Sequence, residues 1–291
     1  MVERISLSRK LFLGGTYGLL SLLSLLCMMP IIHILAVSFS GSAPATAGLV
    51  KFWPVQFTLS SYEYVLNKPE FFRAFGVSLQ RIGLGVTLNI FLAIIIAYPL
   101  SKEVTIFKAR TVYTWIFVFT MLFSGGLIPT FLTIKATGLL DTIWALVIPG
   151  AVPIFLVILL LNFFRGIPRE LEEAAFMDGA GHWITLWRIF VPLSLPSLAT
   201  ITLFSTVNHW NAWFDGFIYM NRPEHMPLQT YLRSVVIDRD TTLQNLPELQ
   251  EVTDRTSIAA QVFLGALPIL LVYPFLQRFF IKGMVLGSVK G

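Results

Sequence analysis

Apolar runs of about 20 residues recur along the whole of this 291-residue chain. An α-helix needs about 20 apolar residues to cross the hydrocarbon core of a bilayer. The chain is 55% hydrophobic and only 13% charged, and its mean hydropathy is +0.74, a composition unlike that of an ordinary soluble domain. We therefore expect an all-α, multi-pass membrane protein.

The apolar runs predict six membrane-spanning helices in a single domain, residues 1–291. We place these helices at about 11–38, 76–100, 111–133, 142–164, 196–219 and 258–280. Two long polar segments, 41–75 and 220–257, are expected outside the bilayer. Pro149, Gly150 and Pro153 predict a bend near the start of the fourth helix, which a membrane helix tolerates when neighbours satisfy the freed backbone groups.

The first apolar run has two interpretations. Basic residues precede it, and Ala45-Thr46-Ala47 resembles the cleavage site of a secretory signal peptide. The apolar core of a signal peptide has about 7–15 residues, whereas this run extends from Leu11 to about Ser38. We therefore interpret it as a retained first helix.

Basic residues indicate the orientation, because Lys and Arg accumulate in the cytoplasmic loops of membrane proteins. If both termini are cytoplasmic, the inner side holds 12 of the 21 basic residues. These are Arg4, Arg9, Lys10, Lys102, Lys108, Arg110, Arg165, Arg169, Arg188, Arg278, Lys282 and Lys290. The isoelectric point of about 9.4 then reflects topology. We expect no nucleic-acid partner, since the basic residues form no stripe with interleaved aromatic residues.

The segment between the fourth and fifth helices, residues 165–195, is unusually polar for this chain. Its start favours a helix, because Pro168 suits a first helical position and three glutamates follow near the positive end of the helix dipole. One narrow face of this helix holds Leu171, Ala174, Ala175 and Asp178. Gly179 and Gly181 then interrupt it. From the residues alone, the segment is either a surface for a partner or an interfacial cap on the bundle.

Part of this segment reads Glu173-Ala174-Ala175, then Gly179, Ile189 and Val191-Pro192. It resembles the cytoplasmic loop of ABC-importer permeases, with the pattern Glu-Ala-Ala, three residues, Gly, nine residues, Ile, one residue and Leu-Pro. Only Val191 departs from that pattern. Residues 123–153 and 277–291 look like the carbohydrate-uptake permeases related to the maltose transporter's second permease. The resemblance covers essentially the whole chain and implies a coupling helix, the EAA loop, between helices 4 and 5.

The resemblance implies that this loop docks on a cytoplasmic ATPase. It assigns a polar contact to Glu173, close packing to Ala174 and Ala175, and the turn after the docking helix to Gly179. Asp178 lies on the same face and is expected at the same interface. The C-terminal tail, including Lys290 and Gly291, is expected near the ATPase by the same resemblance.

The implied protein is a permease subunit of an ATP-binding-cassette importer that brings oligosaccharides into the cytoplasm. Its implied partners are a second homologous permease, two ATPase subunits and an extracytoplasmic solute-binding protein. Its implied place is the bacterial cytoplasmic (inner) membrane, with both termini cytoplasmic. The sequence has no G-x-x-x-x-G-K-[ST] phosphate loop, so ATP and Mg are expected on the partner ATPase, with no catalytic residue here. With Cys27 as its one cysteine, we expect no metal centre and no cofactor.

The fifth predicted helix carries polar and aromatic residues of the kinds that hold sugars. Ser205, Asn208, Asn211 and Asp215 follow at spacings that place them along one helical face, and Trp210 and Trp213 lie beside them. Polar groups at membrane depth normally face a bundle interior or an aqueous cavity, so we expect Asn208, Trp210, Asn211, Trp213 and Asp215 along the substrate pathway. The alternative is that the asparagines hydrogen-bond neighbouring helices and the tryptophans lie at the membrane interface.

Two further questions stay open from the residues. Arg81 in the second helix either extends toward the outer surface or meets an anionic sugar such as a uronate oligomer. A stand-alone secondary sugar carrier or facilitator is the alternative function, against which stand the loop pattern and the lack of a row of ionisable residues at mid-membrane. A structural membrane-anchor subunit of a complex is a third interpretation, but it does not explain the polar face of the fifth helix.

Overall fold

The described residues, 7–242 and 254–288 of a computed structural model, form helices joined by turns and loops, with no strand among them. An all-α fold is therefore confirmed. The chain divides into two units, Met1–Pro69 with Ser234–Ala266 and Glu70–Arg233 with Leu267–Gly291. The prediction of one permease domain over the whole chain stays a prediction.

The first unit is built around the end of a long helix. It contains α1 (Leu7–Ser38), α2 (Ser42–Thr46) and α3 (Ser60–Leu66), together with parts of α14 (Leu228–Thr242) and α15 (Asp254–Ser288). Its small core comprises Ala36, Val37, Ala45, Val50 and Ala259. Arg255 on α15 donates from Nη1 to the Ala45 carbonyl oxygen at 3.0 Å. The side chains of α1 before this core are largely exposed, as suits a helix that faces lipid or another subunit.

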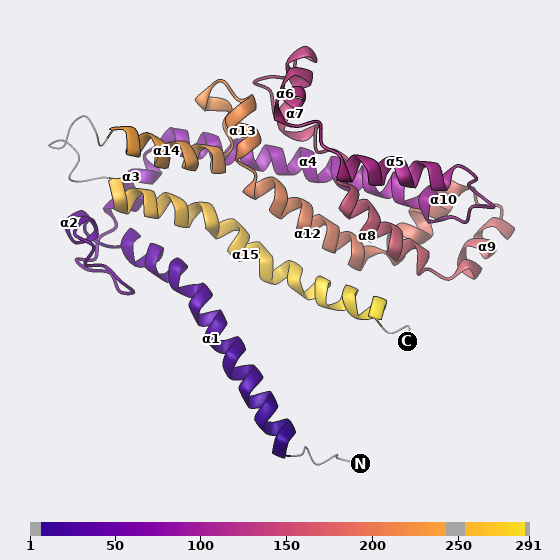
Figure 1. The fold of residues 1–291 in the computed structure, drawn as a ribbon, viewed down its shortest axis with the longest axis horizontal. Helices are drawn as coiled ribbons and strands as arrows, with labels where there is room; N and C mark the ends of the chain where they lie inside the picture. The colour runs from indigo at the N-terminus through magenta and orange to yellow at the C-terminus, as the bar shows by residue number, and fades with distance from the viewer. Residues whose placement is uncertain (1–6, 243–253, 289–291) are drawn as a thin grey trace. The chain divides into compact units, whose positions relative to one another are not determined.

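The second unit is organised along α4 (Pro69–Ser101), which Figure 1 shows running beside α12 and α8. The other elements of the unit are α5 (Arg110–Leu122), α6 (Leu127–Ala136), α7 (Ile143–Val147), α8 (Ile154–Arg165), α9 (Arg169–Met177), α10 (His182–Thr185), the π-helical turn η1 (Leu186–Phe190), α11 (Val191–Leu193), α12 (Leu195–Asn211), α13 (Phe214–Tyr219) and the 3₁₀ turn η2 (Pro223–His225). Its core joins apolar residues of α4, α8, η1 and α12.

Among the described residues, three helices are long and apolar enough to cross a membrane: α1, α4 and α15. The number rises to five if each of two sharply bent helix pairs is one span, and α8 is a shorter apolar helix. The prediction of multiple spans is thus confirmed, whereas the count of six is not.

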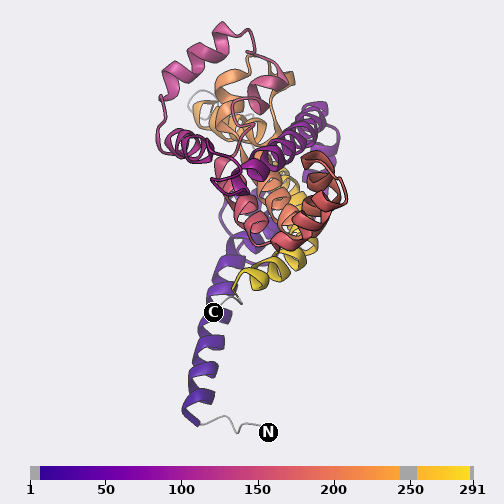
Figure 2. The same ribbon diagram turned by 90° about the vertical axis from the view of Figure 1, so that its right-hand side faces the viewer.

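Three predicted spans are interrupted. The third, predicted at 111–133, is wrong as one helix, because α5 and α6 meet at 111° (Figure 2). The break lies at Ser124-Gly125-Gly126, where Gly126 has φ +87°, a conformation that only glycine adopts without strain. The fourth, predicted at 142–164, is interrupted between α7 and α8 near the expected bend at Pro149 and Pro153. The fifth, predicted at 196–219, stops at Asn211 and resumes at Phe214.

Candidate functional site

The loop at residues 165–195 begins with the helix α9, which ends in a glycine-dependent turn. Gly179 has φ +80°, and its N–H donates to the Phe176 carbonyl at 3.0 Å. The N–H of Ala180 donates to the Ala175 carbonyl at 2.9 Å. These two bonds form a Schellman motif, which closes a helix with a left-handed residue after its C-cap. The geometry therefore has Gly179 at the turn after α9, where the sequence places it.

The two sides of α9 differ in exposure. Glu173, Ala174 and Asp178 are exposed, whereas Ala175 is buried within the chain. The predicted common face of Ala174 and Ala175 is therefore divided, since consecutive helical residues point about 100° apart. Only Ala174 of the two is available to a partner. Met177, at 88% exposure, adds an apolar side chain that the sequence reading did not single out.

The buried side of α9 is held to the end of α4 by an ion pair. Lys102, directly after α4, places Nζ 2.6 Å from Glu172 Oε1 on α9, and both side chains are largely buried. The ammonium group lies 4.0 Å from the ring centroid of Tyr98 and 4.1 Å from that of Phe190. Burial lowers the pKa of Lys102, although the hydrogen bond and the charge of Glu172 act in the opposite direction.

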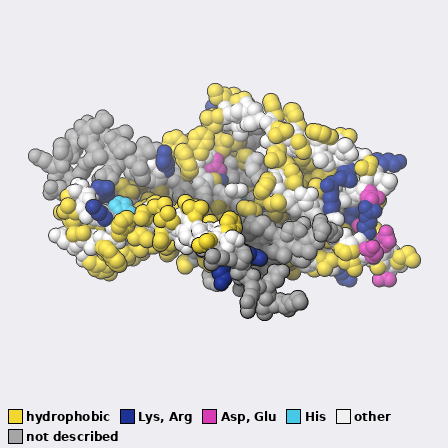
Figure 3. All heavy atoms as spheres, turned by 60° about the horizontal axis from the view of Figure 1, so that its bottom comes forward, with side chains coloured by type: hydrophobic (Ala, Val, Ile, Leu, Met, Phe, Trp, Pro, Cys, Tyr) yellow, Lys and Arg dark blue, Asp and Glu magenta, His cyan; other side chains and the backbone are white. Residues whose placement is uncertain are grey.

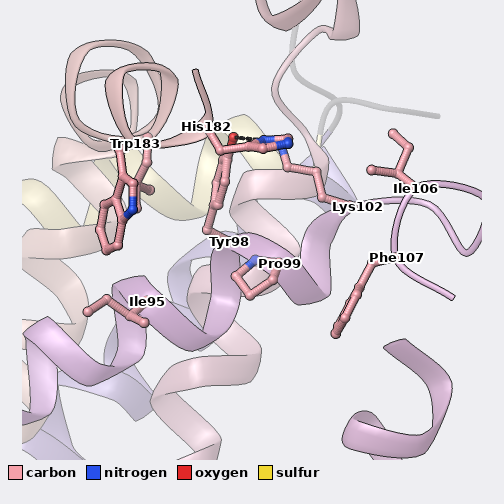
Figure 4. Close-up of a pocket in the computed structure, with 9 residues that line it drawn as sticks. Ile95, Tyr98, Pro99, Lys102, Ile106, Phe107, His182 and Trp183 are labelled. Carbon is pink, nitrogen blue, oxygen red and sulfur yellow. Dashed lines mark hydrogen bonds between the residues drawn. The ribbon is translucent and has the colours of Figure 1, made fainter. Parts of the chain in front are cut away.

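An apolar pocket of about 320 Å³ lies beside this ion pair (Figure 4). Its lining includes Tyr98 and Lys102 from the end of α4, and His182 and Trp183 from α10. The Tyr98 hydroxyl lies 3.3 Å from Nδ1 of His182. Figure 3 shows acidic and basic side chains gathered around α9, with hydrophobic side chains over much of the surface beside them. Charged and apolar surfaces therefore meet at this loop.

The predicted polar face of the fifth helix is divided by the break at Ala212 and Trp213. Because α12 ends at Asn211, Asp215 lies on α13 and does not continue the spacing of the residues before it. Asn208 and Asn211 are exposed, and Trp213 is 37% exposed. Trp210 is 2% exposed and packs edge-on against Phe75 of α4. The structure thus brings Asn208, Asn211 and Trp213 to the surface of this subunit, and places Trp210 in its interior.

Asp215 forms an ion pair with Arg81 of α4. Arg81 Nη1 lies 3.1 Å from Asp215 Oδ1, and Nη2 contacts Oδ2. The same Nη1 donates to the Ala212 carbonyl at 3.4 Å, and this carbonyl belongs to the break between α12 and α13. The Arg81 side chain is only 4% exposed, so it neither extends toward the surface nor stands open to an anionic sugar. Both earlier readings of Arg81 are therefore wrong.

A second set of hydrogen bonds joins α4 to α12 and to the interruption before α8. Asn89 Oδ1 accepts from Ser205 Oγ at 2.8 Å and lies 2.9 Å from His209 Nε2. Arg81 Nε donates to His209 Nδ1 at 3.4 Å, an arrangement that requires the imidazole proton on Nε2. Asn89 Nδ2 donates to the carbonyls of residues 150 and 151 at 2.9 Å each. Side chains of α4 thus satisfy the carbonyls of two interrupted spans, as a low-dielectric environment requires.

The sequence predictions above do not include the polar stripe on α4 that makes these contacts, although the spacing of its residues indicates it. Ser78, Arg81, Gly85 and Asn89 recur at intervals of three, four and four residues, which is one helical face. Ser78 Oγ accepts from the Leu228 N–H at 2.8 Å, so every polar member of the stripe bonds another element. A polar stripe in an apolar helix marks a buried polar contact.

Two other predictions concern the C-terminal tail and the absence of a metal centre. Lys290 and Gly291 lie outside the described residues. No group of three or more His, Cys, Asp and Glu side chains that could hold a metal occurs within residues 7–242 and 254–288.

Residues 82–286 match the family described as the inner membrane component of binding-protein-dependent transport systems. The chain belongs to this family. The permease is therefore a transport subunit of the inner membrane. The α9 loop, Asn89 and the break between α12 and α13 all lie within the matched residues.

The permease is similar, along nearly its whole length, to the following proteins. It is 41% identical to LplC of Bacillus subtilis over 97% of this chain and 93% of LplC. It is 38% identical to the polygalacturonan/rhamnogalacturonan transport system permease YtcP of Bacillus subtilis, over 98% of this chain and 100% of YtcP. A crystal structure of a bacterial ABC transporter involved in the import of the acidic polysaccharide alginate contains a similar chain. Its TM-score is 0.85 at 32% identity, covering 96% of this chain and 100% of that one.

Proposed function

We propose that the permease imports oligosaccharides that contain uronic acids, as one subunit of an ATP-driven importer. The observation that carries this proposal is the 38% identity along almost the entire length of a permease named for polygalacturonan and rhamnogalacturonan. A structural relative from an alginate transporter, at 32% identity, supports the same substrate class, since alginate is described as an acidic polysaccharide. Both relatives are named for acidic polysaccharides, but the two polymers differ.

The importer would contain the permease, a second homologous permease, two ATPase subunits and an extracytoplasmic solute-binding protein. ATP and Mg would bind to the ATPase subunits, and this chain would need no cofactor. The basic residues of the short loops favour a topology with both termini and the α9 loop on the cytoplasmic side. Long outer segments would then face the binding protein.

The α9 loop is proposed as the ATPase contact. Glu173, Ala174 and Asp178 are exposed on one helix that ends in a defined turn at Gly179, so the docking surface is rigid as well as accessible. The uncharged neighbour Met177 projects from the end of the same helix. Such a surface combines a polar rim with an apolar contact, as protein interfaces do.

The substrate pathway is proposed along the exposed residues of α12 and the break that follows. Asn208 and Asn211 are exposed in this subunit, and an asparagine at membrane depth needs an aqueous or protein environment. Trp213 lies beside them with an exposed ring surface, which can stack on the apolar face of a sugar. Asp215 and Trp210 would support this surface from behind, because both pack within the subunit.

The experiment that tests this substrate class measures ATP hydrolysis by the purified importer in lipid nanodiscs with its binding protein. Tetragalacturonate should stimulate hydrolysis several-fold, and maltotetraose at the same concentration should not. Equal stimulation by both sugars, or stimulation by maltotetraose alone, contradicts the uronate assignment. Asn211→Leu should lower tetragalacturonate uptake at an unchanged membrane level, while Asn162→Leu, at an exposed asparagine of α8, should leave uptake unchanged.

The docking role of α9 has its own test. Glu173→Ala combined with Gly179→Pro should abolish uptake while the permease reaches the membrane at its normal level. Normal uptake by that double variant removes the docking role. A stand-alone carrier is the alternative function, and it predicts uptake that continues without internal ATP.

A further inference from the structure

The end of α4 carries a cation in a buried and fully occupied position. Lys102 is 6% exposed, and its ammonium group has three contacts: the Glu172 carboxylate of α9, the Tyr98 ring of α4 and the Phe190 ring of η1. Each contact comes from a different element of the second unit. The position of one ammonium group therefore depends on the positions of α4, α9 and η1 together.

Stabilisation of the contact with α9 does not by itself explain why the charged Lys102 side chain is buried here. Removing two ions from water costs several kcal/mol each, and well-packed apolar residues often stabilise a protein as much as a buried ion pair. What an ion pair adds is direction, because a hydrogen bond of 2.6 Å fixes the relative position of its partners more tightly than an apolar contact does. The two ring faces at about 4 Å restrict the ammonium group further.

The partner of Lys102 adjoins the proposed docking face. Glu172 points into the subunit, and the next residue, Glu173, is exposed. Both stand on the same turn of α9, a helix with a defined end at Gly179. A force applied to the exposed side of this turn therefore acts directly on the carboxylate that holds Lys102.

The far part of α4 contacts the proposed pathway. Arg81 and Lys102 are 21 positions apart, which corresponds to roughly 30 Å along a helix. Arg81 holds Asp215 and the Ala212 carbonyl at the break between α12 and α13. The helix α4 thus ends next to Lys102, which forms a buried ion pair with α9. Farther along, the same helix carries Arg81, a buried arginine that pairs with Asp215 at the break between α12 and α13.

We propose that Lys102 is a positioning residue for energy coupling, whose ion pair with Glu172 makes α9 and α4 move together. A displacement of α9 by the ATPase is then passed along α4 to Arg81 and the break between α12 and α13. This inference rests on the proposed function, since it concerns how ATP hydrolysis is linked to transport. Coupling between distant sites needs such a continuous set of rigid elements and directional contacts.

A second ion pair between the same two segments supplies a matched comparison. Arg169 of α9 contacts Glu103, the residue after Lys102, but their side chains are 70% and 49% exposed. Exposed ion pairs contribute little, because water and salt screen them. The Arg169–Glu103 pair therefore also joins α9 to the segment after α4, but it lacks the burial and the ring contacts of the Lys102–Glu172 pair.

The test compares three permeases in proteoliposomes that contain the full importer: wild type, Lys102→Met with Glu172→Met, and Glu103→Gln, which breaks the exposed pair without changing α9. The measured quantity is the number of tetragalacturonate molecules taken up per ATP hydrolysed. The paired methionines fill the buried volume without leaving an unpaired charge, so the thermal stability of this variant should stay near that of wild type. Lys102→Met alone leaves Glu172 buried without its cation and should lower stability as well.

Lys102→Met with Glu172→Met should lower the transport-to-hydrolysis ratio about threefold or more, with ATP hydrolysis retained. The exposed-pair variant should keep the wild-type ratio. A wild-type ratio in the double-methionine variant overturns the inference, and so does an equal loss in both variants. If the wild-type importer shows no ATP-driven uptake, the proposed function itself fails, an outcome visible before any variant is compared.

Discussion

Arg81 on α4 and Asp215 on α13 form a two-pronged ion pair, in which Arg81 Nη1 lies 3.1 Å from Asp215 Oδ1 and Nη2 contacts Oδ2. The pair joins residues 134 positions apart in the chain. It also neutralises Arg81, the arginine for which the sequence left open a contact with an anionic sugar. The carboxylate-bearing substrate that we propose would therefore find its polar contacts elsewhere, either on this subunit's exposed residues or on the proposed second permease.

Asp215→Asn should destabilise the permease by about 3 kcal/mol, because it leaves the buried Arg81 guanidinium without its counter-ion. The thermal stability of the detergent-purified permease measures this loss. Glu224→Gln is the control, since Glu224 pairs with Arg73 of α4 at 3.9 Å and both side chains are mostly exposed. Its effect should stay below about 0.5 kcal/mol. Equal stabilities of Asp215→Asn and wild type contradict the assigned role.

The contact between α4 and α12 depends on a missing side chain. A Cβ atom at Gly85 would lie 2.5 Å from two atoms of the His209 imidazole, which is itself fixed by Asn89 and Arg81. Gly85→Ala should therefore cost about 1–3 kcal/mol by separating the helices. Gly83→Ala on the same helix has open space around its Cβ and should be neutral or slightly stabilising. Thermal unfolding of the two alanine variants makes the comparison, and equal midpoints contradict the packing at Gly85.

The helix α9 and the turn that ends it could be predicted from the sequence because their signals are local. Pro168 before the helix, the glutamates of its first turn and Gly179 after its end each act within a few residues. The common face predicted for Ala174 and Ala175 is divided because Ala175 is buried. The burial of one side of a short helix depends on what packs against it. Here Lys102 and Glu172 decide which side turns inward, and they are 70 positions apart.

Gly179→Ala should weaken the turn after α9 by about 1 kcal/mol, because alanine is strained at φ +80°. The helix α9, which we propose docks on the ATPase, would then lose its defined end, and ATP-driven uptake should fall while the membrane level holds. Gly181→Ala is the matched control, because Gly181 has φ −84° and any residue adopts that conformation. Loss of uptake in the Gly181 variant to the same extent would argue for a general sensitivity of the loop.

Asp141 connects the segment before α7 to the segment after α13. It accepts hydrogen bonds from the N–H groups of Asn221 and Arg222, at 3.0 and 3.2 Å, and its Oδ1 lies 3.0 Å from Nδ1 of His225. Burial, the largest single influence, opposes ionisation, but these hydrogen bonds and the His225 charge together lower the pKa of Asp141 below its ordinary 3.8. Asp141 also has φ +59°, which asparagine tolerates as well as aspartate does.

Asp141→Asn should therefore remove the charge without straining the backbone, at a cost of about 1 kcal/mol. A lowered pKa in the folded state contributes stability that is present above 3.8 and is lost as the pH falls through the folded pKa. The difference in thermal stability between wild type and variant should be present at about pH 5 and should close below pH 3.8. A difference that persists in that acidic range contradicts the assignment.

The breaks in the predicted spans show what local reasoning lacks. Apolar composition predicts that a segment enters the membrane, but the same composition fits a straight helix and a bent pair. Ser124-Gly125-Gly126 gave a local warning of the 111° turn. At Ala212 and Trp213 no glycine or proline marks the break, and its carbonyls are satisfied from a distance, by Arg81 at Ala212 and by Thr230 Oγ1, 2.8 Å from the Trp213 carbonyl. The helical face predicted to include Asp215 therefore ends at Asn211.

ATP-dependent uptake by reconstituted proteoliposomes tests directly whether the permease works as part of an ATP-driven importer. The permease, its partner permease and the ATPase are placed in the liposomes, with ATP and Mg inside and tetragalacturonate with its binding protein outside. Tetragalacturonate should accumulate only when both ATP and the binding protein are present, and liposomes with the permease alone should accumulate none. Accumulation by the permease alone, or without ATP, contradicts the proposed function as an importer subunit and indicates a self-sufficient carrier.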